Sequence, residues 1–215
     1  VDAISGNQQT HAPDAYVSDL FDSFAENFEK SLLEELEYQT PTLLSEMLWD
    51  IFEEGTEFRN VLDLGCGTGL MGDELCEYCE HMTGIDLSKG MLGKAEIKGI
   101  YDELHQLELV AFLENTDQSY DLIMATDVFV YIGNLDAVFK EVATKLDSEG
   151  LFLFSTEKGG LEEFIITPTG RFKHSTEYVM NLAEKYQLKL VDHRQDVVRK
   201  EKGENVDGDL FLFER

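Results

Sequence analysis

Residues 61–69 read Val61-Leu62-Asp63-Leu64-Gly65-Cys66-Gly67-Thr68-Gly69, an apolar run followed by three closely spaced glycines. The apolar run predicts a buried β-strand, and the glycines predict a tight turn that opens a helix. Glycine permits a positive φ and lets a ligand touch the main chain. Because the free N–H groups at a helix start attract anionic or polar ligands, this stretch predicts a nucleotide-type cofactor site.

The spacing of the glycines helps to choose between cofactors. A dinucleotide-binding turn uses G-x-G-x-x-G, in which the third glycine lets the helix pack close to the strand. Here the glycines stand at 65, 67 and 69, and Leu70 takes the place of that third glycine. The spacing therefore disfavours a dinucleotide, although an NAD(P)-dependent oxidoreductase is an alternative that would use a similar sheet.

Length, charge and cysteine content narrow the class of protein. The 215 residues can form one domain with a sizeable core, and no apolar run approaches the length of a membrane span. The net charge of -27 repels phosphate backbones and anionic membranes, so we expect neither nucleic acid nor a membrane as partner. Solubility explains this acidity most simply, and a small or cationic substrate also fits. The three cysteines suggest no disulfide framework, which predicts the reducing cytoplasm.

The apolar pattern predicts an α/β fold. Helical spacing over residues 17–36 and 43–52 predicts an N-terminal helical arm or lid over residues 1–56, ahead of a cofactor-binding domain over 57–215. Strands are expected near 60–64, 81–86, 105–109, 120–126, 150–155, 187–199 and 208–213. Helices are expected near 68–79, 88–97, 134–146 and 175–186. This alternation predicts a Rossmann-like parallel sheet with helices on both faces, within a single structural domain.

An acidic residue, Asp86, ends the second predicted strand in Gly84-Ile85-Asp86-Leu87-Ser88. A carboxylate in this position can accept hydrogen bonds from both hydroxyls of a ribose. The alternative is that Asp86 only caps the helix that begins near Ser88, and we favour ribose binding. Leu87 and Met91 could flank an adenine, although apolar residues here are equally typical of a core.

With these motifs in this order, the chain resembles the class I S-adenosylmethionine-dependent methyltransferases. The resemblance implies a seven-stranded, mostly parallel sheet in the methyltransferase strand order with an antiparallel last strand. It also implies S-adenosylmethionine as cofactor and S-adenosylhomocysteine as product. The cofactor contacts that it implies, or that the motifs suggest, are Asp63, Gly65, Cys66, Gly67, Gly69, Asp86, Leu87, Met91, Glu108, Leu109, Thr126, Asp127 and Val128. Glu108 would bond the adenine amino group, unless it is one more solvated charge.

The predicted strand over 120–126 ends in Thr126-Asp127-Val128-Phe129-Val130-Tyr131, which the resemblance places beside the sulfonium. Phe129 and Tyr131 could then line the substrate pocket. Amino-methyltransferases that act on nucleic-acid bases or protein glutamine carry an Asn/Asp-Pro-Pro-aromatic box here, and this chain has none. We therefore expect methyl transfer to an O, N or C atom of a small molecule. A non-catalytic cofactor-binding or interaction module is the alternative.

The resemblance is closer to a group of bacterial predicted methyltransferases, some of which carry tetratricopeptide repeats ahead of the catalytic domain. Three segments carry it: residues 12–22, 127–133 and 169–175. No such repeat is visible in this sequence. The group does not supply an acceptor.

Three further features could serve the acceptor. Arg171 could pair with a substrate carboxylate or phosphate, and His174 or Asp127 could remove a proton as the catalytic base. Alternatively, Arg171 satisfies neighbouring carboxylates and Ser175 caps the next helix. Aromatic residues of the arm could close over the site, with Tyr16, Phe24 and Tyr38 as candidates. For Cys76 and Cys79 we expect helix packing and no metal.

Overall fold

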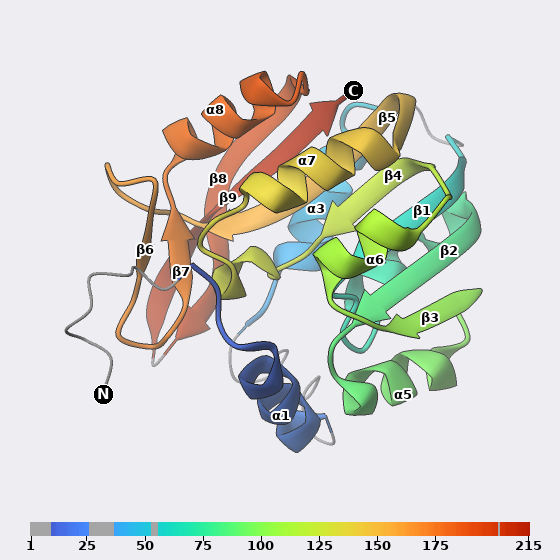
Figure 1. Cartoon of the computed structure of the whole chain (residues 1–215), viewed down its shortest axis with the longest axis horizontal. Helices are drawn as coiled ribbons and strands as arrows, with labels where there is room; N and C mark the ends of the chain where they lie inside the picture. The colour runs from blue at the N-terminus through green and yellow to red at the C-terminus, as the bar shows by residue number, and fades with distance from the viewer. Residues whose placement is uncertain (1–9, 26–36, 53–55, 202) are drawn as a thin grey trace.

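The computed structural model describes residues 10–25, 37–52, 56–201 and 203–215. Its centre is a seven-stranded sheet (Figure 1). The strands lie in the order β3 (Glu103–Gln106), β2 (Cys79–Asp86), β1 (Phe58–Leu64), β4 (Tyr120–Ala125), β5 (Leu146–Glu157), β9 (Glu204–Glu214), β8 (Lys189–Glu201). The pairs among β1 to β5 are parallel, whereas β9 runs antiparallel to both of its neighbours. The predicted mostly parallel sheet with an antiparallel last strand is confirmed.

Helices cover both faces of the sheet. One face carries α6 (Leu109–Asn115), α7 (Asp136–Lys145) and α8 (Thr176–Lys185), and the other carries α3 (Thr40–Trp49) and α4 (Leu70–Leu75) (Figure 1). Along β4, Ile123 packs with the first set of helices, while Leu122 and Met124 pack with the second. Each such buried side chain stabilises the fold by about 1.5–3 kcal/mol. Because helices cover both faces of the sheet, a central strand such as β4 buries the side chains on both of its faces. This explains why its sequence is apolar without alternation.

Smaller elements surround this core. Helix α5 (Lys89–Lys98) lies beside β3 and contacts α1 (Asp14–Phe24), which together with α3 belongs to the arm predicted over residues 1–56. A separate hairpin, β6 (Phe164–Ile166) and β7 (Phe172–His174), follows β5, and the turn η3 (Phe129–Tyr131) follows β4. The part of the arm predicted over residues 26–36 lies outside the described residues. None of the described helices is long and apolar enough to cross a membrane.

Two predicted elements end clearly earlier than expected. The strand expected over 105–109 ends at Gln106, and Leu109 begins α6, which the pattern did not predict. The cause is Glu108, whose side chain accepts a hydrogen bond of 2.8 Å from the N–H of Ala111 and caps the helix. The helix expected over 68–79 ends at Leu75, and a 3-10 turn, η2 (Cys76–Tyr78), leads into β2 at Cys79.

Candidate functional site

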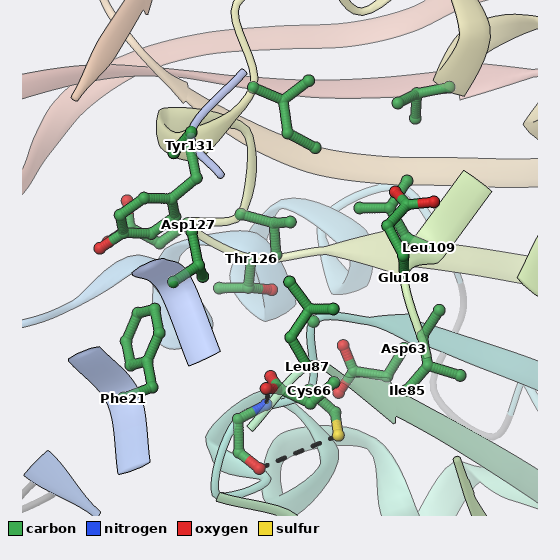
Figure 2. A pocket seen from close by; sticks show the side chains of 18 of the residues that line it. Phe21, Asp63, Cys66, Ile85, Leu87, Glu108, Leu109, Thr126, Asp127 and Tyr131 are labelled. Carbon is green, nitrogen blue, oxygen red and sulfur yellow. Dashed lines mark hydrogen bonds between the residues drawn. The ribbon is translucent and has the colours of Figure 1, made fainter. Parts of the chain in front are cut away.

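A cavity of about 480 Å³ lies at the carboxyl ends of β1, β2 and β4. This volume falls in the range of about 300–1,000 Å³ that small-molecule sites occupy. The strand order reverses between β1 and β4, so the cavity lies where open α/β sheets bind ligands. Side chains from the loops after β1, β2, β3 and β4 and from helix α1 are among those that converge on it (Figure 2). The predicted residues that line it are Tyr38, Asp63, Gly65, Cys66, Gly67, Asp86, Leu87, Glu108, Leu109, Thr126, Asp127, Val128, Tyr131 and Arg171.

The glycine turn forms the floor of the cavity. Gly65, Gly67 and Gly69 all have a positive φ, of 69°, 55° and 89°. At Gly65 a Cβ atom would lie 2.6 Å from the side chain of Val128, so no larger residue fits there without a shift. The turn therefore exposes main chain to the cavity at 65 and 67, as the pattern predicted.

Asp86 joins the end of β2 to the glycine turn. Its Oδ2 accepts a hydrogen bond of 3.0 Å from the N–H of Gly67, and its Oδ1 accepts one of 2.7 Å from the N–H of Ser88. The cap of α5 is Ser88, whose hydroxyl accepts from the N–H of Met91. Burial raises the pKa of Asp86, while the two N–H groups oppose this shift. A carboxylate has about four acceptor positions, so each oxygen can accept one more bond on the cavity side.

Asp63 places a second carboxyl group at the cavity. It is 1% exposed, and its Oδ2 accepts a hydrogen bond of 2.7 Å from the hydroxyl of Tyr101. Burial raises the pKa of Asp63 to about 7, the hydrogen bond from Tyr101 lowers it, and the charge of Asp86 raises it further. This end of the cavity therefore favours groups that donate hydrogen bonds or carry positive charge.

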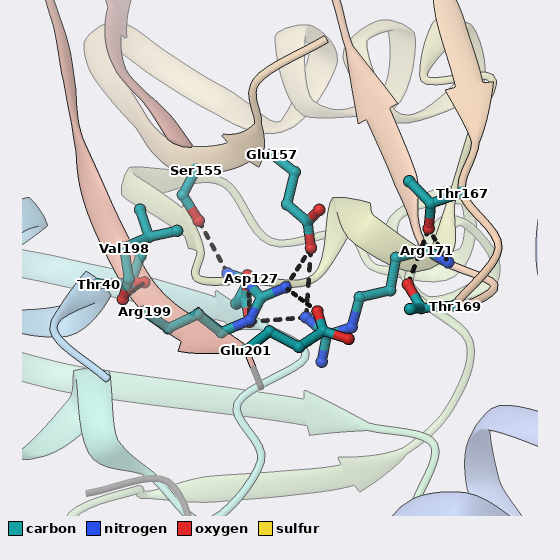
Figure 3. A network of polar contacts seen from close by, with 10 residues as sticks. All are labelled: Thr40, Asp127, Ser155, Glu157, Thr167, Thr169, Arg171, Val198, Arg199 and Glu201. Atoms are coloured by element: carbon teal, nitrogen blue, oxygen red, sulfur yellow. Dashed lines mark hydrogen bonds and ion pairs between the residues drawn. The ribbon is translucent and has the colours of Figure 1, made fainter. Parts of the chain in front are cut away.

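Asp127, directly after β4, has an unusual backbone conformation. Its φ is 59°, which is uncommon for a non-glycine residue and costs about 1–3 kcal/mol. The N–H of Asp127 donates to the hydroxyl of Ser155 at 2.9 Å. Its carboxylate pairs with two arginines, with 3.3 Å from Oδ1 to Nη1 of Arg199 and 3.7 Å from Oδ2 to Nη1 of Arg171 (Figure 3).

Glu157, at the end of β5, joins the same arginines. Its Oε1 accepts from Nη2 of Arg199 and from Nη1 of Arg171, the second at 3.4 Å. Arg199 is almost fully buried in β8, where an arginine requires carboxylate partners. Arg199 was not predicted as a site residue, and the one sign of it in the sequence is a charged residue inside a predicted strand. We call Asp127, Glu157, Arg171 and Arg199 the arginine–carboxylate cluster.

Two tyrosines line the cavity next to this cluster. The guanidinium of Arg171 lies over the ring of Tyr131, 5.7 Å from its centroid. The other contact of Tyr131 is edge-to-face with Phe21 of α1, at 5.5 Å. Burial raises the pKa of Tyr131, and it raises the pKa of Tyr38 well above its usual value. Both phenols are therefore neutral hydrogen-bond donors near pH 7.

Six of the predicted site residues do not line the cavity: Tyr16, Phe24, Gly69, Met91, Phe129 and His174. Tyr16 and Phe24 are more than half exposed, whereas Phe129 and Met91 are core residues. A Cβ at Gly69 would meet Tyr101 instead of the cavity.

His174 is fully buried in the β6–β7 hairpin. Its Nε2 donates to the carbonyl oxygens of Ile132 and Gly133, at 2.9 and 3.0 Å. Burial lowers its pKa to about 4. A role as general base in the cavity therefore has no support in this position.

Comparisons with known proteins agree with this architecture. Residues 62–154 match the protein family described as a methyltransferase domain. The ubiquinone biosynthesis O-methyltransferase of Coxiella burnetii is 26% identical over 130 residues, which are 59% of this chain and 53% of that protein. The chain thus spans about half the length of this curated relative.

Solved structures extend the likeness to nearly the whole chain. The magnesium protoporphyrin IX methyltransferase of Synechocystis, solved with bound S-adenosylhomocysteine, has a TM-score of 0.71 at 14% identity and covers 94% of this chain and 99% of its own. The cyclase SpnF has a TM-score of 0.75 at 13% identity and covers 97% and 99%. The chain therefore has the fold of S-adenosylmethionine-dependent methyltransferases, with a match to their catalytic domain family over residues 62–154.

Proposed function

We propose that this protein is an S-adenosylmethionine-dependent methyltransferase that acts on an O, N or C atom of a small-molecule acceptor. The observation that carries the proposal is the cavity at the sheet's switch point, where the main chain at Gly65, the carboxylate of Asp86 and the loop after β4 meet. The family match over residues 62–154 supports it. The acidic surface favours a small acceptor over nucleic acid, and the three free cysteines favour the cytoplasm.

The lining residues fit this cofactor. Asp86 has free acceptor positions for the two hydroxyls of a ribose, and Leu87 and Leu109 provide apolar surface beside it for an adenine. The side-chain-free turn at Gly65 and Gly67 allows close approach of the methionine part. When bound, S-adenosylmethionine supplies an activated methyl group on sulfur.

The protein's own share of the reaction is alignment and exclusion of water. Phe21 of α1 packs on Tyr131 and covers the cavity on the side of the loop after β4. Holding reactants in the correct geometry contributes about 7–11 kcal/mol to rate acceleration. Because both carboxylates of the arginine–carboxylate cluster already accept bonds from arginines, we assign no catalytic base there.

Calorimetric titration of S-adenosylhomocysteine, S-adenosylmethionine and NADH tests the proposal. We expect binding of the first two alone, and an Asp86→Ala protein that binds at least about tenfold more weakly, since a hydrogen bond to a charged group contributes about 1.5–3 kcal/mol. Asp73→Ala, on α4 and outside the cavity, is the matched control. Binding of NADH alone would overturn the proposal. Cofactor binding unaffected by Asp86→Ala, in a folded protein, would overturn the assignment of the ribose site.

A further inference from the structure

We infer that the acceptor is a small carboxylic acid, bound as its monoanion by the guanidinium of Arg171. The inference rests on the proposed function and names the substrate class for the same cavity. It starts from the arrangement of the arginine–carboxylate cluster at the end of the cavity next to Tyr131 (Figure 3).

The carboxylates of this cluster are already engaged. Asp127 accepts from Arg199 and lies 3.7 Å from Nη1 of Arg171, while Glu157 accepts from both arginines. Because the two arginines already balance the charges of Asp127 and Glu157, a cationic acceptor would meet two guanidinium groups as well as the carboxylates and would gain little net attraction. The acidic side chains at this end of the cavity therefore do not select a cation.

Arg171 has donors to spare. Both of its pairs use Nη1, and among the described residues no group bonds its Nε or Nη2. A guanidinium has five donors in a fixed fork, and its Nε–Nη2 edge matches the two oxygens of a carboxylate. The side chain is 24% exposed and lines the cavity, with its Cζ atom over the ring of Tyr131. The free edge of Arg171 is thus a preorganised site for a planar anion.

Charge balance favours one negative charge over two. Arg171 and Arg199 face Asp127 and Glu157, so the cluster is neutral, and Glu201 adds a partly exposed carboxylate 3.9 Å from Arg199. A monoanion adds one charge to this balance, whereas a phosphate monoester adds nearly two next to three carboxylates. The neutral hydroxyl of Tyr131 offers a further donor at the same end of the cavity. The charge balance and this donor together favour a carboxylate.

The test is calorimetry on the protein saturated with S-adenosylhomocysteine. The probes are carboxylic acids, each compared with the neutral amide of nearly the same shape. The pairs are acetate and acetamide, benzoate and benzamide, and salicylate and salicylamide, with phenyl phosphate as the dianion. We expect at least one acid to bind about tenfold or more tightly than its amide and than phenyl phosphate. Arg171→Gln should weaken the binding of that acid by about 10- to 100-fold.

Arg194→Gln is the control variant. Arg194 lies on β8 and, like Arg171, pairs with two carboxylates, those of Asp50 and Asp192, but it is outside the cavity. This variant should bind the acid like the parent, and both variants should retain their affinity for S-adenosylhomocysteine.

Each other outcome overturns the inference. Tighter binding of the amides, tighter binding of phenyl phosphate, equal loss in both arginine variants, or no acid bound at millimolar concentration would each do so. Failure of S-adenosylhomocysteine to bind the parent protein would remove the proposed function itself, and is seen in the first titration. Saturation with the cofactor product but no acid binding would leave the proposed function standing and remove only the assignment of Arg171.

Discussion

Asp63 gives the most specific prediction from this structure. It is a fully buried carboxyl group with no cationic partner among the described residues, so its ionisation destabilises the fold. Burial raises its pKa from 3.8 to about 7. In the unfolded chain the carboxyl loses its proton near pH 4, whereas the folded protein retains the proton until about pH 7. The folded state is therefore penalised progressively as the pH rises from about 4 to 7, and the penalty is complete above pH 7.

The size of the penalty follows from the shift. A rise of about three pH units in a pKa corresponds to about 4 kcal/mol, and this net value already includes the stabilisation of the ionised form by the hydroxyl of Tyr101. Asp63→Asn removes the titration and keeps an acceptor for Tyr101. The variant should unfold at higher urea concentration than the parent at pH 8, by up to about 4 kcal/mol, and with little difference at pH 4.5.

The assay is urea unfolding of the cofactor-free protein at several pH values, followed by circular dichroism. Asp73→Asn, with an exposed side chain on α4, corrects for the loss of one negative charge from a protein of charge -27. If Asp63→Asn differs from Asp73→Asn by the same amount at every pH, the reasoning about Asp63 is refuted. A variant less stable than the parent at pH 8 would refute it equally.

Two further predictions concern helix α1 and the arginine–carboxylate cluster. Asp22 of α1 accepts hydrogen bonds from the hydroxyl of Ser88 and the N–H of Gly90, at 2.5 and 2.9 Å. Because these bonds hold α1 over the cavity, Asp22→Asn should release S-adenosylhomocysteine about tenfold faster in stopped-flow measurements. An unchanged rate would show that these bonds do not hold the helix there. Arg199→Met leaves the buried Glu157 and the partly buried Asp127 without their main partner and should cost about 3–5 kcal/mol in urea unfolding. A loss below about 1 kcal/mol would contradict the assigned role.

The parts of the site that the sequence predicted are those formed by residues close together along the chain. The turn over residues 65–69 needs three positive φ values, and glycine marks each of them. Asp86 ends a strand beside that turn, so its place followed from alternation of strands and helices. The cap formed by Glu108 was missed because a charged residue between two leucines, in Leu107-Glu108-Leu109, has the alternation of a strand.

The arginine–carboxylate cluster could not be predicted in the same way. Its members come from different strands: Asp127 follows β4, Glu157 ends β5, and Arg199 lies in β8. They meet only because β9 pairs with both β5 and β8 in a particular register. No local pattern contains that register. A buried arginine in a strand signals that carboxylates lie nearby, but it does not identify them.

In the segment over residues 171–174, backbone geometry places Arg171 and His174 in different surroundings, although they are close in the sequence. Arg171 and His174 both looked suited to one acceptor site, yet side chains an odd number of residues apart on an extended chain point to opposite sides. Phe172 and His174 are buried, so Arg171 must face the cavity side of the hairpin. The pairing of Arg171 with Asp127 and Glu157 fixes that choice, because the reverse placement would bury an unpaired guanidinium and leave both carboxylates with one arginine fewer. The same contacts that satisfy the carboxylates use only Nη1 of Arg171 and therefore leave its Nε and Nη2 for the proposed acceptor.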